Sequence, residues 1–463
     1  MKAVNLAVEP FSYITYTELE CVRELNCHGS LRVRGLISQE KEAQYTELAC
    51  GETWVNVKAV SGEGEETVFF TGILTGFYLK KENQVTELTI EVKTGSFLLD
   101  IQPHIRSFQN PRMEYREVIR TCAGPAGGAV IMLEKKHEVT GRILMQYEET
   151  DWAFFRRLAS YANTVLIAED VTPGRRFYFG YRVREALDEP KWESHRLIRD
   201  WEGFRRSASL GIQGLRQEDA ISHTIRTREM IRLGESVWFD GQLFVVGRAD
   251  SRLEGQELWH TYSLITKRAG LLPELRNQAL TGVSLKGNVL AVEQTQVQVR
   301  IQADENRENS QSCWMDYATI YSTPDGTGWY CMPEIGDEVR LVFPDGDERH
   351  VYAAGSVHLG AAAERTDPNR KSWKNRQGKE ILFTPDSILL RNNKGLSLEL
   401  SDVDGIRLCS DTDIVMQSAG DIRIGSQGGV HLSAKNNISM QQGAASIRLD
   451  HEIRVAGGKI YMN

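Results

Sequence analysis

The sequence predicts a mainly β protein with three parts: a paired, barrel-like N-terminal region with two or more helices, an OB-fold barrel, and a C-terminal intertwined trimeric β-prism. Three observations predict this order. Apolar and polar residues alternate over much of residues 1–270, five short strand patterns fall within residues 282–358, and an eight-residue repeat fills much of residues 379–463. Alternation with a period of two is typical of half-buried strands. The 463 residues, 41% apolar and 25% charged, suit a globular chain of several domains.

The N-terminal region, residues 1–270, is predicted to consist of two related halves. Residues 29–37 and 66–79 alternate in polarity, and residues 82–92 follow as the return strand of a hairpin. Residues 234–265 repeat the same order of strand, glycine, strand, polar hairpin and long strand. We therefore expect two pseudo-related β-barrel halves.

Two helical patterns interrupt these strands. The first covers residues 110–122, where Asn110 is the expected N-cap and a proline occupies the first turn. The second covers residues 150–162 and begins at Thr150 or Asp151. Its apolar residues recur with helical spacing, which predicts one buried face.

The remainder of the chain divides by composition. Residues 271–281 are predicted to be a linker, and residues 282–358 hold five short strands, which fit a small OB-type barrel. Residues 359–378 are small and polar and contain proline, as expected of a surface connector. From residue 379 to residue 463, the pattern is strand and turn throughout.

The eight-residue repeat is strict over six triplets. Each triplet has the pattern apolar, any, apolar, and the triplets begin at Leu398 and recur to Ile438, with Gly, Asp, Asn, Ser and Gln between them. Each repeat is therefore one short strand followed by one corner. The predicted core of this needle is Leu398, Leu400, Ile406, Leu408, Ile414, Met416, Ile422, Ile424, Val430, Leu432, Ile438, Met440, Ile447 and Leu449.

Burial decides how such a repeat folds. One strand buries two side chains, which does not offset the ~1–2 kcal/mol per residue that ordering the backbone costs. A single chain winding on itself would give fewer than three layers. Three chains around one axis would stack about eight layers, roughly 40 Å at ~4.8 Å per layer. We therefore expect a trimeric prism; the alternative is an antiparallel meander of one chain with accidental spacing.

Several functions are disfavoured by the sequence. A net charge of −8 argues against nucleic-acid binding, and no signal peptide or membrane-spanning segment is present, so assembly in the cytoplasm is expected. The seven cysteines show no Cys-x-x-Cys pair and are expected to be reduced thiols. Neither a nucleophile elbow nor a phosphate-binding loop occurs, and we expect no catalytic residues and no cofactor.

His451 is the one candidate metal ligand. It shares parity with Ile447, Leu449, Ile453 and Val455, so three copies could meet on a threefold axis and bind a metal through neutral imidazoles. The alternative is an ordinary histidine at a corner, which the flanking acidic residues favour.

A family resemblance emerges from specific motifs. The segment MQYEETDWAFFRRLASYANTVL (145–166) resembles the signature of the valine-glycine repeat (VgrG) spikes of contractile injection systems and related phage tail hubs. WYCMPEIGDEVRLVFPDGD (329–347) is similar to the family's OB domain, RSFQNPRMEYREVI (106–119) to its preceding helix, and NRQGKEILF (375–383) to the start of its β-helix. The signature residues are Tyr147, Asp151, Trp152, Phe155, Leu158, Pro333, Gly336 and Asp337, and most are expected to be structural.

The resemblance implies a non-enzymatic homotrimer. Its N-terminal region would adapt to a hexameric inner-tube protein within a baseplate, and its needle would contact a target membrane transiently during delivery. A PAAR-like tip protein, with a possible cargo effector, would dock on the end of the needle. The implied docking residues are Gly457, Gly458, Ile460, Tyr461, Met462 and Asn463.

Two other functions stay open, a cell-wall-degrading, lysozyme-like tail enzyme and a β-prism adhesin. The type of particle is also open: a type VI secretion system, a phage tail, a tailocin or an extracellular system. The particle tip, whether extracellular or membrane-anchored, would be the protein's final location.

Overall fold

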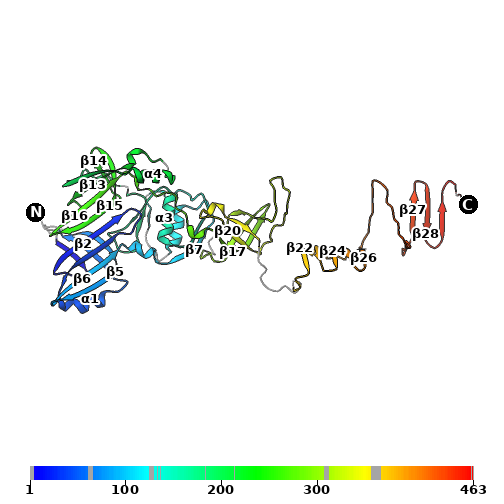
Figure 1. Cartoon of the computed structure of the whole chain (residues 1–463), viewed down its shortest axis with the longest axis horizontal. Helices are drawn as coiled ribbons and strands as arrows, with labels where there is room; N and C mark the ends of the chain where they lie inside the picture. The colour runs from blue at the N-terminus through cyan, green and yellow to red at the C-terminus, as the bar shows by residue number, and fades with distance from the viewer. Residues whose placement is uncertain are drawn as a thin grey trace. The chain divides into compact units, whose positions relative to one another are not determined.

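The computed structural model describes residues 5–60, 66–124, 130–132, 134–135, 137–182, 184–212, 214–306, 312–355, 366–459 and 461. The chain divides into two compact units, Met1–His358 and Leu359–Asn463, which are described separately. Strands dominate both units in these segments, which confirms the predicted mainly β fold (Figure 1). None of the helices within the described segments is long and apolar enough to cross a membrane.

An eleven-stranded sheet, here called the hub sheet, organises the N-terminal part of the first unit (Figure 1). Its strand order is β1-β4-β5-β6-β3-β2-β15-β16-β13-β12, and β14 pairs with β15. The strands are β1 (Asn5–Glu9), β2 (Thr15–Glu24), β3 (Ser30–Ile37), β4 (Trp54–Val60), β5 (Glu66–Glu82), β6 (Val85–Lys93), β12 (Ser194–Arg199), β13 (Ile221–Thr227), β14 (Ser236–Phe239), β15 (Gln242–Glu254) and β16 (Glu257–Ile265).

The two halves of the hub sheet have the same strand order. The first is β4-β5-β6-β3-β2 and the second is β14-β15-β16-β13-β12. Each half has its own hydrophobic cluster, centred on Val33 and Phe70 in the first and on Val246 and Tyr262 in the second. The halves are not separate sheets, because β2 pairs directly with β15.

The helices partly match the sequence-based expectation. Helix α3 (Asp151–Tyr161) begins as predicted, with the Thr150 hydroxyl accepting a hydrogen bond from the Ala153 N–H at 3.2 Å. The prediction for the other helix was wrong at its start: α2 (Tyr115–Ala123) is capped by Glu114 in a reciprocal box with Glu117, and the Asn110 side chain instead closes a preceding turn.

Further elements complete the first unit. Helices α1 (Glu42–Leu48) and α4 (Trp201–Ser209) were not predicted. Helices α2 and α3 pack around an aromatic cluster that includes Trp152, Phe155 and Phe177. The remaining short elements are β7 (Pro103–Phe108), β8 (Val130–Met132), β9 (Leu144–Thr150), β10 (Leu166–Ala168), β11 (Phe177–Phe179), and the 3-10 turns η1 (Gln39–Lys41), η2 (Gly95–Leu99), η3 (Gln217–Ala220), η4 (Arg268–Gly270), η5 (Gln278–Leu280) and η6 (Glu348–His350).

The OB barrel contains all five predicted strands in the order β19-β18-β17-β20-β21. Inward residues of β17, β18 and β20 fill its core, as period-two alternation requires. The strands are β17 (Val283–Glu293), β18 (Gln296–Ile301), β19 (Trp314–Asp316), β20 (Glu338–Phe343) and β21 (Tyr352–Ala354).

The second unit consists of two antiparallel meanders separated by a segment without strands. The first meander has the order β22-β23-β24-β25-β26 and the second the order β27-β28-β29. Residues 410–437 lie between them, and their bends recur every eight residues. The strands are β22 (Lys371–Lys374), β23 (Glu380–Phe383), β24 (Ser387–Arg391), β25 (Ser397–Ser401), β26 (Gly405–Cys409), β27 (Ile438–Gln442), β28 (Ala445–Leu449) and β29 (Ile453–Ala456).

Candidate functional site

The predicted needle residues share one face of the first meander. Leu398 pairs with Leu390 on one side and with Leu408 on the other, and Leu400 pairs in the same way with Ile388 and Ile406. These pairs form two parallel apolar rows, because residues two apart on a strand point to the same side. The opposite face of the same strands is polar at its centre, where Glu399 pairs with Arg407.

The second meander repeats this arrangement. Ile438 pairs with Leu449, and Met440 pairs with Ile447. Ser439 pairs with Arg448 on the other face. Both meanders are therefore amphipathic sheets whose apolar rows include the needle residues predicted within these strands.

In a single chain this apolar face is largely uncovered. Ile406 is 77% exposed and Leu408 is 55% exposed. A groove of about 700 Å³ on this face is lined by Leu390, Leu398 and Ile414, among others. Exposed apolar surfaces of this kind are typical of interaction sites.

The central segment, residues 410–437, has the octad geometry without strand partners. The hydroxyls of Ser410, Ser418 and Ser426 each accept a hydrogen bond, at 3.1 Å, from the backbone N–H two residues later. A serine-based turn therefore closes three of the four corners of this segment, in phase with the repeat, and the fourth corner has Ala434 at the serine position. The intervening needle residues are exposed: Ile414, Met416, Ile422, Ile424, Val430 and Leu432.

The end of the second unit shows no assembled site in one chain. His451 is exposed at the turn between β28 and β29, and the segments that the structure describes contain no cluster of three or more metal-ligating side chains. Gly457, Gly458 and Tyr461 of the predicted tip-docking set are also exposed. The other three residues of that set, Ile460, Met462 and Asn463, lie outside the described residues.

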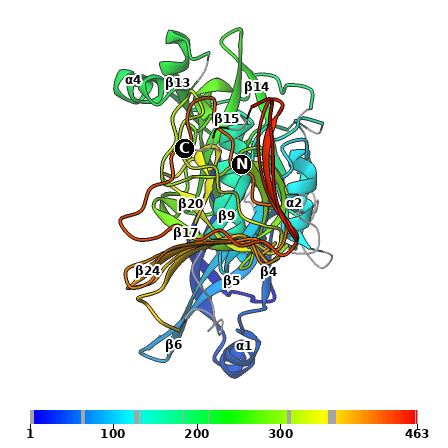
Figure 2. The ribbon, with the colours of Figure 1, turned by 90° about the vertical axis from the view of Figure 1, so that its right-hand side faces the viewer.

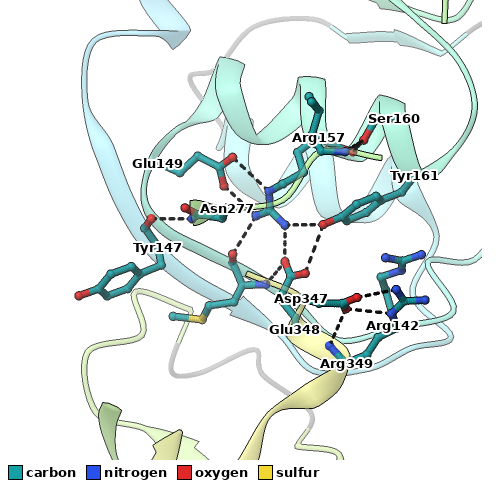
Figure 3. Close-up of polar contacts among 12 residues, drawn as sticks. Arg142, Tyr147, Glu149, Arg157, Ser160, Tyr161, Asn277, Asp347, Glu348 and Arg349 are labelled. Carbon is teal, nitrogen blue, oxygen red and sulfur yellow. Dashed lines mark hydrogen bonds and ion pairs between the residues drawn. The ribbon is translucent and has the colours of Figure 1, made fainter. Parts of the chain in front are cut away.

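A buried ion network joins helix α3 to the OB barrel in the first unit (Figure 3). Arg157 on α3 donates to Glu149 on β9 at 2.7 and 3.1 Å, to the Met145 carbonyl at 2.8 Å, and to Glu348 of η6. The Arg157 side chain is 2% exposed and that of Glu348 is 0% exposed. Tyr161 completes the network by donating to Glu348 at 3.2 Å.

The electrostatics of this network favour a permanent contact. Burial opposes the charge of Arg157, but the carboxylates of Glu348 and Glu149 raise the pKa of the guanidinium well above its ordinary value. Burial raises the pKa of Glu149, and Arg157 opposes that rise. Burial also raises the pKa of Tyr161 to about 12, so its hydroxyl stays protonated as a donor. One cation thus holds two carboxylates, one fully buried and one 12% exposed.

Strand β7 makes a second contact with the OB barrel. The Asp304 carboxylate accepts from the Ser107 N–H at 3.0 Å and from the Ser107 hydroxyl. The Glu305 carboxylate accepts from the Ile105 N–H at 2.9 Å. Burial opposes ionisation of Glu305, but the bond from Ile105, together with His104, lowers its pKa.

The predicted linker, residues 271–281, is part of the same junction. Asn277 donates to the Tyr147 carbonyl at 2.8 Å, and the Leu275 N–H donates to the Ser160 hydroxyl at 3.0 Å (Figure 3). Met145 of β9 lies within the OB core. The β7–β9 pair, the linker and the barrel therefore form one packed structure.

The signature residues fall at two places around this junction. Trp152, Phe155 and Leu158 are buried core residues, while Asp151 pairs with Arg106 at 2.6 Å and Tyr147 contributes the carbonyl described above. The other three form a turn on the OB barrel: Pro333, Gly336 and Asp337.

That turn is held against strand β17. Gly336 has φ +95°, a value that favours glycine, and its N–H donates to the Val289 carbonyl at 2.8 Å. The Asp337 carboxylate accepts from the Glu334 N–H at 2.9 Å. Sequence reasoning did not single out Arg157 and Glu348 as site residues. The only sequence signal near Arg157 is its position beside the apolar stripe of the predicted helix.

Comparison with known proteins matches the barrel to a described domain family and the chain's fold to several solved structures. Residues 285–358 match the family model described as the type VI secretion system/phage-baseplate injector OB domain. No sequence among the curated proteins matches the chain.

Solved structures extend the likeness beyond the barrel. A component of the E. coli type VI secretion system, the c3393 protein, described as similar to the T4 bacteriophage tail proteins gp27 and gp5, is 13% identical with a TM-score of 0.51. The alignment covers 76% of this chain and 100% of that one. The half-lidded Francisella PdpA-VgrG complex is 8% identical with a TM-score of 0.58, covering 88% of each chain.

The lidded form of that complex is 9% identical with a TM-score of 0.55, covering 85% of this chain and 76% of the other. At these identities the likeness is one of fold. Residues 285–358 are therefore an injector OB domain, in a chain with the fold of the VgrG-like spikes of type VI secretion systems and phage baseplates.

Proposed function

We propose that this chain is the homotrimeric central spike of a contractile injection system. In this role it joins a hexameric inner tube and its baseplate to a piercing tip and helps to deliver cargo. The injector OB domain and the spike-like fold support the general class. The trimer, the tip and the delivery role are our proposal.

The observation that carries the proposal is the uncovered apolar face of the second unit. Its two rows run through both meanders, and the six octad residues between them are exposed in one chain. Burying each apolar side chain of this size contributes about 1.5–3 kcal/mol, and a single chain that leaves them in water loses this contribution in its second unit. Two further copies around a common axis cover every row at once.

The same assembly satisfies the backbone of residues 410–437. Unpaired backbone N–H and C=O groups are costly once buried, and strands from neighbouring chains are the partners that an octad repeat can supply. The serine turns keep three of the four corners in phase, so the repeats between them present their apolar residues to the axis at equal spacing.

The buried network around Arg157 suits a protein that transmits force. It fixes the OB barrel to helix α3 and the β7–β9 pair through ion pairs, a linker and a shared core, with Arg157 at its centre. We propose no catalytic step for this chain. Clearing of purified peptidoglycan by the protein would favour the tail-enzyme alternative instead.

The partners follow from this role. By analogy with the Francisella complexes, in which VgrG occurs with PdpA, we expect a partner protein to assemble with the spike. We propose that a tip protein of the PAAR type binds near Gly457, Gly458 and Tyr461. The assembled spike would then lie at the end of the particle, in transient contact with a target membrane.

Two adjacent substitutions in β27 test the apolar-face observation. Met440 is 51% exposed, so Met440→Asp would be harmless in a chain that stays single. In a trimer it places three carboxylates at the axis, and we expect light scattering to show loss or weakening of the trimer. Ser439→Asp, on the opposite face and paired with Arg448, is the control and should leave the trimer intact. Equal behaviour of the two variants would contradict the proposal.

A further inference from the structure

The loop between strands β19 and β20 of the OB barrel forms a pocket that the proposed spike role does not use. The pocket has a volume of about 730 Å³, which lies within the range of small-molecule sites. Its lining consists of loop residues 317–322 and 326–332, Asp316 at the end of β19, and Thr295 in the turn between β17 and β18. OB folds bind ligands on the face of their second and third strands and with the loop between the first two. The pocket therefore adjoins the usual ligand surface of this fold.

The loop that forms the pocket is a closed hairpin. Ser322 makes a β-bridge with Gly328, and one residue further out the Trp329 N–H donates to the Tyr321 carbonyl at 2.8 Å. Gly328 has φ +141°, and a side chain at this position would clash with the Tyr321 carbonyl oxygen, so the position requires glycine. The hairpin therefore holds Tyr321 and Trp329 opposite each other on its two arms.

Three aromatic side chains of this hairpin are exposed to solvent. Tyr321 is 50% exposed, Trp329 is 52% exposed and Tyr330 is 71% exposed. The Tyr330 hydroxyl donates to the Gln294 carbonyl at 2.9 Å, which anchors this ring at its edge. The Trp329 carbonyl accepts from the Thr319 hydroxyl at 3.0 Å, which fixes the backbone of the second arm. Exposed aromatic rings on a fixed backbone are typical of a surface that binds a ligand by stacking.

The other lining residues define the charge of that ligand. Among the described residues that line the pocket, none is lysine, arginine or histidine, and the one carboxylate is that of Asp316. Phosphates and nucleic acids are bound through cations, so the pocket does not suit them. The hydroxyls of Thr295, Thr319 and Ser322 also line the pocket, and a wholly apolar ligand would leave such groups without partners. The lining therefore suits a neutral ligand that combines apolar faces with hydroxyl groups.

We propose that this pocket binds a neutral saccharide. The C–H faces of the sugar ring stack on Tyr321 and Trp329, and the sugar hydroxyls exchange hydrogen bonds with Asp316 and the lining hydroxyls. The carboxylate accepts hydrogen bonds from sugar hydroxyls and repels acidic sugars, which makes the site selective for neutral ones. This function goes beyond the proposed spike role and does not depend on the trimer. It would let the OB barrel recognise a glycan.

A second copy of the chain is the alternative occupant of this surface. The core of a protein interface is typically apolar and depleted of charged residues. This pocket instead has Asp316 and several hydroxyl groups beside its aromatic rings. These polar groups favour the saccharide, and the mass of the protein in solution distinguishes the two occupants.

A glycan array and calorimetry on the full-length protein test the proposal. The array carries neutral glycans beside sialylated and sulfated ones, and we expect saturable binding to neutral members. For the neutral glycan with the strongest signal, isothermal titration calorimetry gives the dissociation constant. Trp329→Ala should raise this constant by about tenfold, the order expected for the loss of one aromatic contact. Trp329→Phe keeps a ring at this position and should retain most of the affinity.

Trp238→Ala is the matched control. Trp238 is 46% exposed, and its strand β14 lies apart from strands β17 and β20 of the OB barrel in both views (Figure 1, Figure 2). The loss of an exposed tryptophan outside the pocket should leave glycan binding as it is in the unsubstituted protein. Equal weakening by Trp238→Ala and Trp329→Ala would place the glycan elsewhere and overturn the proposal.

Three further outcomes would also overturn the saccharide site. They are an array without signal on any neutral glycan, stronger binding of the sialylated or sulfated glycans, and neutral-glycan binding that Trp329→Ala leaves unchanged. Light scattering separates the second copy: if the protein binds no glycan and Trp329→Ala lowers its mass, the exposed rings belong to a contact between copies. A trimeric protein without glycan binding would leave the proposed spike standing.

Discussion

Arg157 and Glu348 form a buried ion pair that joins helix α3 to the OB barrel, although 191 positions separate them in the chain. Both side chains are almost completely inaccessible to water, and Glu149 and Tyr161 complete the network. A contact of this kind does not stabilise by its charge alone, since burial costs each ion its hydration. Its effect is to raise the free energy needed to separate the two parts, which suits the force-transmitting role proposed above.

Removing the cation should therefore be severe. Arg157→Ala leaves Glu149 and Glu348 buried without a counter-charge, and we expect a loss of about 3–5 kcal/mol in the stability of the first unit. Chemical denaturation followed by tryptophan fluorescence measures it. Arg206→Ala, which breaks an exposed pair with Glu202 at 2.8 Å, is the control and should cost no more than about 0.5 kcal/mol. A similar small effect for both variants would show that the junction does not depend on the ion pair.

Lowering the pH should reduce the free energy of unfolding of the first unit through protonation of His28. Burial lowers the pKa of this imidazole from its ordinary 6.5 to about 4, and the nearby Asp100 opposes the shift. Because the folded-state pKa is depressed, His28 favours folding above pH 6.5, and this contribution is lost as the pH falls from 6.5 towards 4.

The pH dependence of the free energy of unfolding checks this. His28→Gln should make that free energy less sensitive to pH in this window, by up to about 1.4 kcal/mol per pH unit. If His28→Gln left the slope unchanged, His28 would not be the titrating group.

The signature turn of the OB barrel should depend on glycine at one position. Gly336 has φ +95°, so Gly336→Ala forces a side chain into a backbone region that disfavours it, at a cost of about 1–2 kcal/mol. Gly355→Ala is the matched control, since Gly355 also has open space around it but no positive φ. Thermal unfolding should show a lower midpoint for the first variant only. Equal midpoints would mean that the turn relaxes without strain.

Thiol labelling should follow burial. Hydrogen bonds from Thr53 and the backbone lower the pKa of the exposed Cys50 thiol, whereas burial raises that of Cys21 to about 12. We expect a maleimide to modify Cys50 rapidly and Cys21 only on unfolding, as read by peptide mass spectrometry. Rapid modification of Cys21 in the native protein would contradict the pairing of β2 with β15, which buries this side chain.

Much of the fold could be predicted because its signals are local. Period-two alternation located the hairpin of residues 66–92 and the five OB strands, and the octad spacing selected residues that share one sheet face. Helix α4 was not predicted: it has nine residues, includes Gly203, and buries none of its side chains. The start of α2 was misplaced because Glu114, a poor N-cap alone, is supported by Glu117.

The junction could not be predicted for a different reason. Arg157 occurs in a helix with a second arginine beside it, and nothing local shows that only this one is enclosed. Its partner Glu348 comes from a turn in another domain. Burial of a charge is a property of the assembled structure, and sequence spacing does not encode it.

The molar mass of the full-length protein in solution, measured by light scattering, tests the central claim most directly. The account predicts the mass of three chains, because in the proposed trimer three copies cover the apolar rows that contain Leu398, Leu408 and Met440. A folded protein with the mass of one chain would contradict it.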